Sequence, residues 1–370
     1  MRALISWLLV ATGLGAAPRL HAQDQRFVYV SNVTGTTRDS AALTTIEAQT
    51  TRALERVDDS LRAHGLGLGD VVVANVFLTD ARHFAGMNEV YRTFFPVDPP
   101  TRATAEVDLT DPDAMIQLSV VAARGPRQVI DPPELASPSL PYSWGIRVGN
   151  TLFLAGATSR NPATYAPEPG DVGAQTRRIF GNLGLVLRRA GMDYGDLASC
   201  RVFLEDPRRF GEMNRAYAEF VPADAPPARA TLGAGLMHPL FDVEIQCTAE
   251  RSATRRVVIA EGGSRPRSPY SPAIATEERL YLAGMLGGGP DVTAQTRATL
   301  ENLRATLAAA RLDFTHVTDT WVYVADIRQW DAVRTVLDEV LPAGTPRGTV
   351  IGAPLMGATL LVEIQMVARR

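Results

Sequence analysis

The sequence repeats itself three times, and this repetition limits the possible folds more than any other feature. Each copy contains a Gln-Thr pair that opens a helical stretch; the pairs are Gln49-Thr50, Gln175-Thr176 and Gln295-Thr296. They lie 126 and 120 residues apart, which is the length of a small domain. The 370 residues therefore predict three copies of one unit rather than unrelated domains.

The predicted elements follow the same order in each copy. A strand follows the first helix in all three copies, over residues 71–78, 197–204 and 317–324. A second helix begins at an aromatic residue and is followed by a proline 12 residues later; the aromatic residues are Phe84, Phe210 and Trp330. A strand closes each copy, over 116–122, 243–249 and 362–368. This order predicts an α+β unit with a mixed sheet and two helices on one face.

The repeats divide the chain into four segments. We expect a signal peptide over 1–22, repeat 1 over 23–124, repeat 2 over 125–252 and repeat 3 over 253–370. Repeats 2 and 3 have additional upstream strands, whereas repeat 1 starts directly at Phe27 and is expected to lack the first hairpin.

Residues 1–22 have the pattern of an export signal. Arg2 precedes an apolar run of about 15 residues, and Ala22 offers a small residue for cleavage. The run is shorter than the roughly 20 residues of a membrane-spanning helix, although an uncleaved anchor remains the alternative. We therefore expect a periplasmic or secreted protein, cut near Ala22 and not attached to a membrane afterwards.

The composition excludes several chemistries. All 37 basic residues are arginine, which excludes a Schiff-base lysine and a phosphate-loop lysine. The net charge of −3 argues against a nucleic-acid partner. The histidines are scattered without paired spacing, so we expect no metal site. Cys200 and Cys247 lie in apolar, strand-like stretches, and both a disulfide and two buried free thiols are compatible with that placement.

The motifs of the repeat resemble those of the RidA (YjgF) family of reactive-intermediate deaminases. Pro-Tyr-Ser, at Tyr142 and Tyr270, precedes a strand that ends in Leu-Ala-Gly, at Gly156 and Gly284. Further shared motifs are Phe-x-x-x-Asn-x-x-Tyr in the second helix, a proline-arginine turn and a closing Val-Glu-Ile-Gln strand. The resemblance covers almost the whole chain after the signal peptide, three times over.

The resemblance implies a chorismate-mutase-like fold, sites between neighbouring units and hydrolysis of 2-imino acids, or of their enamine tautomers, to 2-oxo acids and ammonia. It implies no metal or organic cofactor. Members of the family usually form homotrimers. Three copies in one chain therefore predict a monomeric, intramolecular pseudo-trimer. In the alternative arrangement, each repeat trimerises with other chains.

The resemblance also assigns candidate site residues. The candidate catalytic residues are Arg229, Arg347, Glu244 and Glu363. The candidate substrate-binding residues are Arg102, Arg229, Arg347, Tyr142, Tyr270, Gly156, Gly284, Asn88 and Asn214. An arginine suits this role because a guanidinium binds a carboxylate through two parallel hydrogen bonds.

Some of these assignments have a structural alternative, and repeat 1 is incomplete. The arginines are also explained as surface residues, the glutamates as solvent-facing strand residues and the asparagines as structural hydrogen-bonding groups. Repeat 1 has Gln117 at the glutamate position and Asn32 at the glycine position, so a site that uses them is expected to be weak or silent.

The sequence therefore predicts an exported deaminase for a small imine that bears a carboxylate. A non-catalytic protein that binds small carboxylates in partly degenerate sites is the alternative. Ribonuclease activity, attributed to some members of the family, is disfavoured by the net charge of −3.

Overall fold

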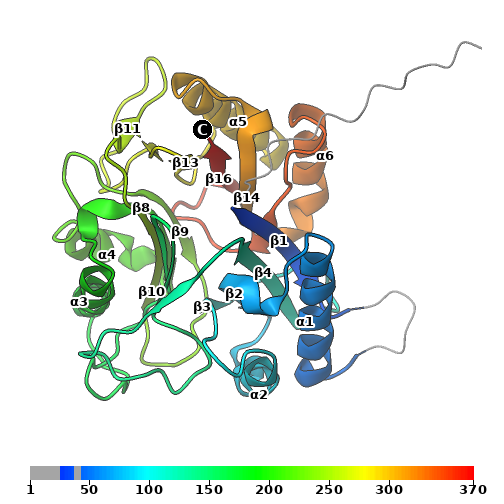
Figure 1. Ribbon diagram of the computed structural model, residues 1–370. Helices are drawn as coiled ribbons and strands as arrows, with labels where there is room; N and C mark the ends of the chain where they lie inside the picture. Colours follow the sequence, from blue (N-terminus) through cyan, green and yellow to red (C-terminus); the bar gives the residue numbers. More distant parts are fainter. Residues whose placement is uncertain (1–25, 37–42) are drawn as a thin grey trace, which may run out of the picture.

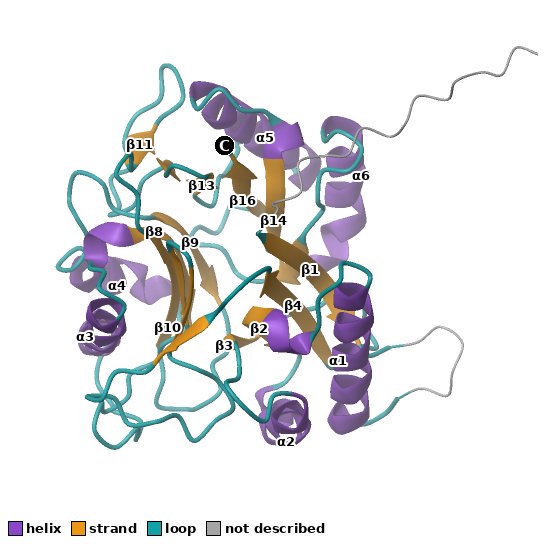
Figure 2. Ribbon diagram, in the orientation of Figure 1, coloured by secondary structure: helices purple, strands orange, loops and turns teal. Residues whose placement is uncertain are grey.

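The computed structural model describes residues 26–36 and 43–370, which form three mixed sheets with helices on their outer side (Figures 1 and 2). The predicted signal peptide lies outside the described residues. Within them, no helix is long and apolar enough to cross a membrane. The predicted fold class, three tandem α+β units, is confirmed.

Repeat 1 has a four-stranded sheet in the order β1-β4-β2-β3. Its elements are β1 (Phe27–Thr34), α1 (Ile46–Arg62), β2 (Val71–Leu78), α2 (Phe84–Phe94), β3 (Thr101–Glu106) and β4 (Ile116–Ala123). Only β2 and β3 pair in parallel.

Repeats 2 and 3 each have a six-stranded sheet, ordered β5-β6-β7-β10-β8-β9 and β11-β12-β13-β16-β14-β15. The elements of repeat 2 are β5 (Gln128–Ile130), β6 (Gly145–Val148), β7 (Thr151–Leu154), α3 (Val172–Arg189), β8 (Leu197–Leu204), α4 (Phe210–Tyr217), β9 (Ala228–Gly233) and β10 (Val243–Glu250). The elements of repeat 3 are β11 (Arg256–Val258), β12 (Ala273–Ala275), β13 (Arg279–Leu282), α5 (Val292–Ala309), β14 (Val317–Val324), α6 (Trp330–Val340), β15 (Thr349–Gly352) and β16 (Val362–Arg369).

The central strands β2, β8 and β14 have the predicted bounds, but the sheets contain a strand that the sequence pattern did not predict. Between the second helix and the closing strand, β3, β9 and β15 pair in parallel with β2, β8 and β14. We expected a turn there because a proline precedes the arginine in each copy. Their strand conformation depends on pairing with a distant segment, which local sequence does not reveal.

The repeated Gln-Thr pair has a structural role. Gln49, Gln175 and Gln295 are buried, and each side-chain amide lies against the loop that precedes the closing strand of its repeat. Each amide oxygen accepts a backbone N–H from that loop, at 2.8–2.9 Å from the nitrogens of Met115, Asp242 and Leu361. The glutamine therefore ties the first helix to the closing strand.

The three repeats pack against one another within the chain. One apolar cluster contains residues from all three sheets, including Phe77, Phe203 and Tyr323. Backbone hydrogen bonds join each pair of repeats; they run from Glu106 N to Gly235 O (2.8 Å), from Gly233 N to Pro354 O (2.7 Å) and from Asp108 N to Gly352 O (3.0 Å). Strands lie toward the centre in Figure 1 and the helix pairs lie outside. The number of chains in solution stays a prediction.

Cys200 and Cys247, whose pairing the sequence left open, form a disulfide between β8 and β10. They stand directly opposite each other in the antiparallel register, with Cα atoms 4.1 Å apart.

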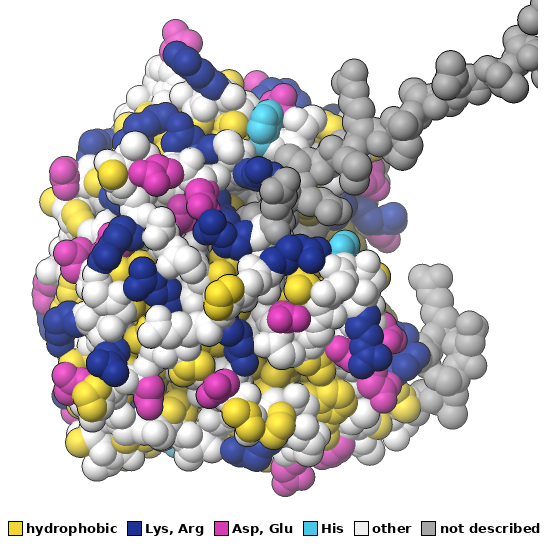
Figure 3. Space-filling model, viewed as in Figure 1, with side chains coloured by type: hydrophobic (Ala, Val, Ile, Leu, Met, Phe, Trp, Pro, Cys, Tyr) yellow, Lys and Arg dark blue, Asp and Glu magenta, His cyan; other side chains and the backbone are white. Residues whose placement is uncertain are grey.

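On the face shown in Figure 3, arginine and acidic side chains are interspersed rather than gathered by sign.

Candidate functional site

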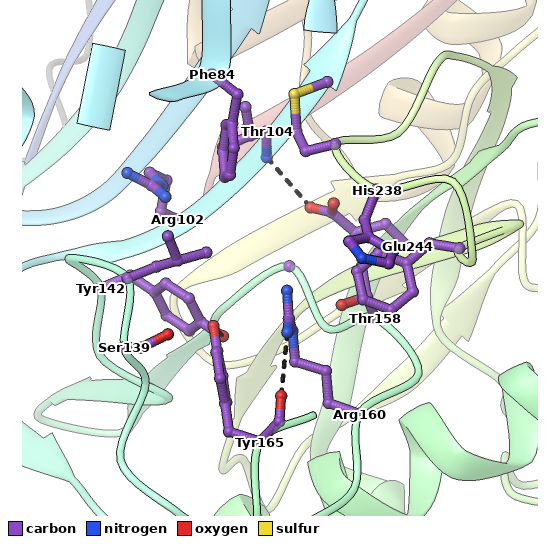
Figure 4. A pocket seen from close by; sticks show the side chains of 14 residues that line it. Phe84, Arg102, Thr104, Ser139, Tyr142, Thr158, Arg160, Tyr165, His238 and Glu244 are labelled. Carbon is purple, nitrogen blue, oxygen red and sulfur yellow. Dashed lines mark hydrogen bonds between the residues drawn. The ribbon is translucent and has the colours of Figure 1, made fainter. Parts of the chain in front are cut away.

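Residues of repeats 1 and 2 line an open pocket of about 240 Å³, which we call the first site (Figure 4). Arg102 comes from β3, Glu244 from β10, Gly156 follows β7 and Tyr142 lies before β6. The N–H of Gly156 donates to the carbonyl oxygen of Arg102 at 2.9 Å, which joins the end of β7 to β3. The pocket therefore combines the arginine of one repeat with the glutamate, glycine and tyrosine of the next.

Arg102 is buried among aromatic rings. Its guanidinium carbon lies 4.9 Å from the ring centroid of Tyr91, 5.7 Å from that of Phe84 and 6.0 Å from that of Tyr142. These contacts stabilise the cation without using its N–H groups. Nη1 is buried and has no hydrogen-bond partner among the described residues. Because an unsatisfied buried donor costs about 1–3 kcal/mol, Arg102 is suited to binding a carboxylate.

Glu244 faces the same pocket. Its Oε1 accepts a hydrogen bond from the backbone N–H of Thr104 at 3.2 Å. Burial raises the pKa of Glu244 to about 7, although this N–H and the charges of Arg102 and Arg160 act in the opposite direction. A carboxyl group that titrates near neutral pH can accept a proton and return it.

Gly156 allows Glu244 to occupy this position. A Cβ atom on Gly156 would lie 2.0 Å from Glu244 Oε1 and 2.9 Å from the Cα of Ala103. Any side chain there would displace the carboxylate or the β3 backbone.

Repeats 2 and 3 place an equivalent set of residues together, which we call the second site. Gly284 N donates to Arg229 O at 3.1 Å, and the Arg229 guanidinium lies 5.5 Å from the Tyr270 ring. A Cβ on Gly284 would meet Glu363 Oε1 at 1.7 Å. Burial raises the pKa of Glu363 to about 8, against the opposing charge of Arg229. Nη1 of Arg229 is also buried without a partner among the described residues.

The asparagines of the second helix differ between the two sites. Asn214 Oδ1 accepts a hydrogen bond from Arg229 Nη2 at 2.7 Å and so orients the guanidinium. Asn88 instead donates from Nδ2 to the Phe84 carbonyl oxygen at 2.7 Å, and its Oδ1 has no partner among the described residues.

The model of the endoribonuclease L-PSP family matches the chain three times, over residues 19–124, 134–251 and 262–370. The chain belongs to this family. The resemblance to RidA (YjgF) proteins is therefore confirmed.

Relatives in the family match about one repeat each. A RutC family protein of Sulfurisphaera tokodaii is 36% identical over 110 residues, which are 29% of this chain and 87% of the relative. Reactive Intermediate Deaminase A, chloroplastic, of Arabidopsis thaliana is 30% identical over 132 residues, which are 36% of this chain and 70% of the relative. A chorismatase crystal structure is similar over 92% of this chain and 97% of its own, with a TM-score of 0.56 and 16% identity, a likeness that concerns the fold alone.

Among the described residues, repeats 3 and 1 do not form a third site with the arginine and glutamate of the first two. Arg102 stands opposite Ala74, and Arg229 stands opposite the corresponding Cys200. In repeat 3, Thr349 stands opposite Trp321, which lies one position further along its strand than Ala74 and Cys200 lie along theirs. The residue at the arginine position is therefore Gly348, one residue before Thr349. Arg347 lies one residue earlier, outside the sites. There it is partly exposed, and its Nε lies 2.9 Å from Asp338 Oδ1.

Hydrogen bonds close the interface between repeats 3 and 1. Asn32, at the glycine position, accepts from Val350 N at 2.8 Å and donates to the Gly348 carbonyl oxygen. Gln117, at the glutamate position, donates from Nε2 to the Val350 carbonyl oxygen at 3.1 Å. This interface therefore lacks both the guanidinium and the carboxylate.

Among the residues that line the first site and that the sequence pattern missed are Arg160, Tyr165 and His238. Arg160 and Tyr165 lie in a loop between Gly156 and Asp171 that is eight residues longer than its counterpart between Gly284 and Asp291. The additional length of this loop is the sequence signal that could have pointed to these residues, and an alignment of the repeats would have shown it. Its residues have no equivalent in repeat 3, so recurrence could not mark them.

Proposed function

We propose that this chain is an exported RidA-like deaminase, which hydrolyses 2-imino acids or their enamine tautomers at the first and second sites. One observation carries the proposal: a buried guanidinium with an unpartnered N–H twice accompanies a buried glutamate whose pKa is raised toward neutrality. The similarity of this chain to a relative named Reactive Intermediate Deaminase A supports it.

The proposed reaction uses these groups in two steps. Arg102 or Arg229 binds the carboxylate of the imino acid and fixes the adjacent C=N carbon. The ionised glutamate takes a proton from a water molecule as its oxygen bonds to the carbon of the protonated imine, whose C=N π electrons move to nitrogen. The protonated glutamate then returns this proton to the amino nitrogen. The C–N bond breaks and ammonia leaves, while the hydroxyl proton passes to the glutamate carboxylate and on to solvent, and the oxygen becomes the carbonyl of the 2-oxo acid.

The proposed test generates 2-iminobutyrate in situ with an amino-acid oxidase and measures the rate of ammonia release. We expect wild type to accelerate release. Arg102→Met and Arg229→Met should each leave one working site, and the double variant should lose the acceleration. Arg347→Met is the matched control because Arg347 lies outside both sites. Acceleration that survives in the double variant would refute the proposed sites.

Export is the second part of the proposal. The pattern of residues 1–22 and the Cys200–Cys247 disulfide support it, since disulfides persist in oxidising compartments. Cell fractionation followed by N-terminal sequencing tests it. A full-length protein that starts at Met1 and stays in the cytoplasm would contradict export.

A non-catalytic carboxylate-binding protein is the second candidate. The closed interface between repeats 3 and 1 favours it, because one of the three possible sites has lost both functional groups. Tight binding of a 2-oxo acid without any acceleration of ammonia release would support this candidate over the deaminase.

A further inference from the structure

We infer that the first site selects a dicarboxylate, namely an imino acid whose side chain bears a second carboxylate, and that Arg160 binds this second group. The inference rests on the proposed function, because it takes the carboxylate next to the imine to be bound by Arg102. The second site, by the same reasoning, takes an uncharged side chain.

Arg160 is a second cation in the pocket of Arg102 and Glu244. Figure 4 shows its side chain pointing into the space between the two tyrosines and Glu244. Its Nη1 donates to the Tyr165 carbonyl oxygen at 3.1 Å. Within the described part of the chain, no carboxylate lies at ion-pair distance from Arg160. Its remaining N–H groups are therefore available to a ligand.

Aromatic rings hold the Arg160 guanidinium in place. Its central carbon lies 4.2 Å from the Tyr165 ring centroid and 4.9 Å from that of Phe241. Asn182, on α3, donates to the Arg160 carbonyl oxygen at 2.8 Å, which fixes the backbone of the loop. Such a preorganised cation loses little conformational entropy when a carboxylate binds.

Tyr165 anchors the same loop over the pocket. Its φ of 63° lies in the left-handed region, which is unusual for an aromatic residue. Its hydroxyl lies 2.8 Å from the hydroxyl of Tyr142, a residue of the proposed imine site. Backbone strain of this kind persists where the surrounding contacts fix it, and here they fix the loop that carries Arg160.

The second site lacks these groups. The shorter loop of repeat 3, residues 285–290, contains neither arginine nor tyrosine, and Gly357 and Leu360 stand in place of His238 and Phe241. The loop that supplies Tyr165 is eight residues shorter in repeat 3. The two sites therefore share the arginine and the glutamate but differ in the groups that contact the far end of a ligand.

The charges explain why the first site should prefer a dicarboxylate. A ligand with one carboxylate would pair Arg102 and leave the Arg160 guanidinium without a carboxylate at ion-pair distance, since Glu244 acts on it only from elsewhere in the pocket. A dicarboxylate would pair both cations. A site built for a charged group discriminates strongly against ligands that lack it, since its own polar groups are then left unpaired.

Calorimetric titration with two products of equal carbon number, 2-oxoglutarate and 2-oxopentanoate, tests the inference. Arg229→Met leaves the first site and Arg102→Met leaves the second. In Arg229→Met we expect 2-oxoglutarate to bind at least about tenfold more tightly than 2-oxopentanoate. In Arg102→Met we expect no preference for the dicarboxylate. Equal affinities in Arg229→Met would overturn the inference.

Adding Arg160→Met to Arg229→Met should abolish the preference and leave 2-oxopentanoate binding within about threefold of its former value. A preference that persists, or an equal loss for both ligands, would overturn the assignment to Arg160. If the double variant does not fold, as judged by circular dichroism, the two ligands in Arg229→Met alone decide. The titrations require no hydrolysis, so a failed deaminase assay and a failed dicarboxylate preference are distinguishable.

Discussion

Replacing Gly156 by alanine tests how tightly the first site is built. The new Cβ would lie 2.0 Å from Glu244 Oε1, 2.8 Å from Ala103 Cβ and 2.9 Å from Ala103 Cα. The carboxylate can rotate away, but Ala103 is part of β3, which is hydrogen-bonded to β2 and to the Gly156 backbone itself. Overpacking in a close-packed interior costs about 1–3 kcal/mol, and a backbone clash places this variant at the upper end.

Alanine variants of two further glycines provide comparisons for this loss of stability. For Gly284→Ala, the three atoms nearest the new Cβ all belong to the side chain of Glu363, so we expect a loss of stability near the lower end, about 1 kcal/mol, together with loss of the second site. Gly181→Ala is the matched control, because it lies inside α3 with no atom within 4 Å of the new Cβ. It should stabilise the protein by about 0.5–1 kcal/mol through helix propensity.

Urea denaturation at pH 7, with the disulfide intact, measures the free energy of unfolding of each variant. Ammonia release, measured with the other site removed by Arg229→Met, measures the activity of the first site. If Gly156→Ala were as stable as wild type and kept first-site activity, the inferred contact between the glycine, the glutamate and β3 would be wrong.

Three further predictions concern other parts of the molecule. Burial raises the pKa of Glu363 from 4.5 to about 8, so the folded state holds this proton more strongly than the unfolded chain does. Wild type should therefore lose stability as the pH rises from about 4.5 through 8. Glu363→Gln should lessen that loss, as measured by denaturation curves at pH 5 and pH 9. Equal pH dependence of stability in both proteins would contradict the raised pKa of Glu363. Reducing the disulfide between Cys200 and Cys247 should lower the free energy of unfolding by about 2–4 kcal/mol, measured with and without dithiothreitol, and an unchanged curve would mean that the bond contributes nothing. Static light scattering of the mature protein should give the mass of one chain, whereas three times that mass would favour trimers of chains.

The sequence predicted the order of elements that the three repeats share, because hydrophobic periodicity is local. The central strands β2, β8 and β14 and the helices that flank them follow from runs of a few residues. The parallel strands β3, β9 and β15 did not follow, because their conformation depends on pairing with residues 28 or 29 positions away.

The prediction of the site residues was limited for the same reason, because local sequence does not show which distant segments come together. Recurrence marked Arg102, Arg229, Glu244 and Glu363, which the structure brings together in two sets. Arg347 was marked as well, as the arginine that follows the turn proline of repeat 3, although it follows Pro346 directly; the register of β14 and β15 shows that Gly348 takes the arginine position. Arg160 was missed because it lies in a loop that is eight residues longer than in repeat 3, so it does not recur there.

By itself, the sequence determined that this chain is a threefold repeat of one α+β unit and which residue types recur in it. Only the tertiary structure decided which residues share a site, since each site takes its arginine from one repeat and its glutamate from the next. The physical reason is that a motif records what each unit carries, whereas the packing of the units determines which of these groups come within hydrogen-bonding distance of a common ligand.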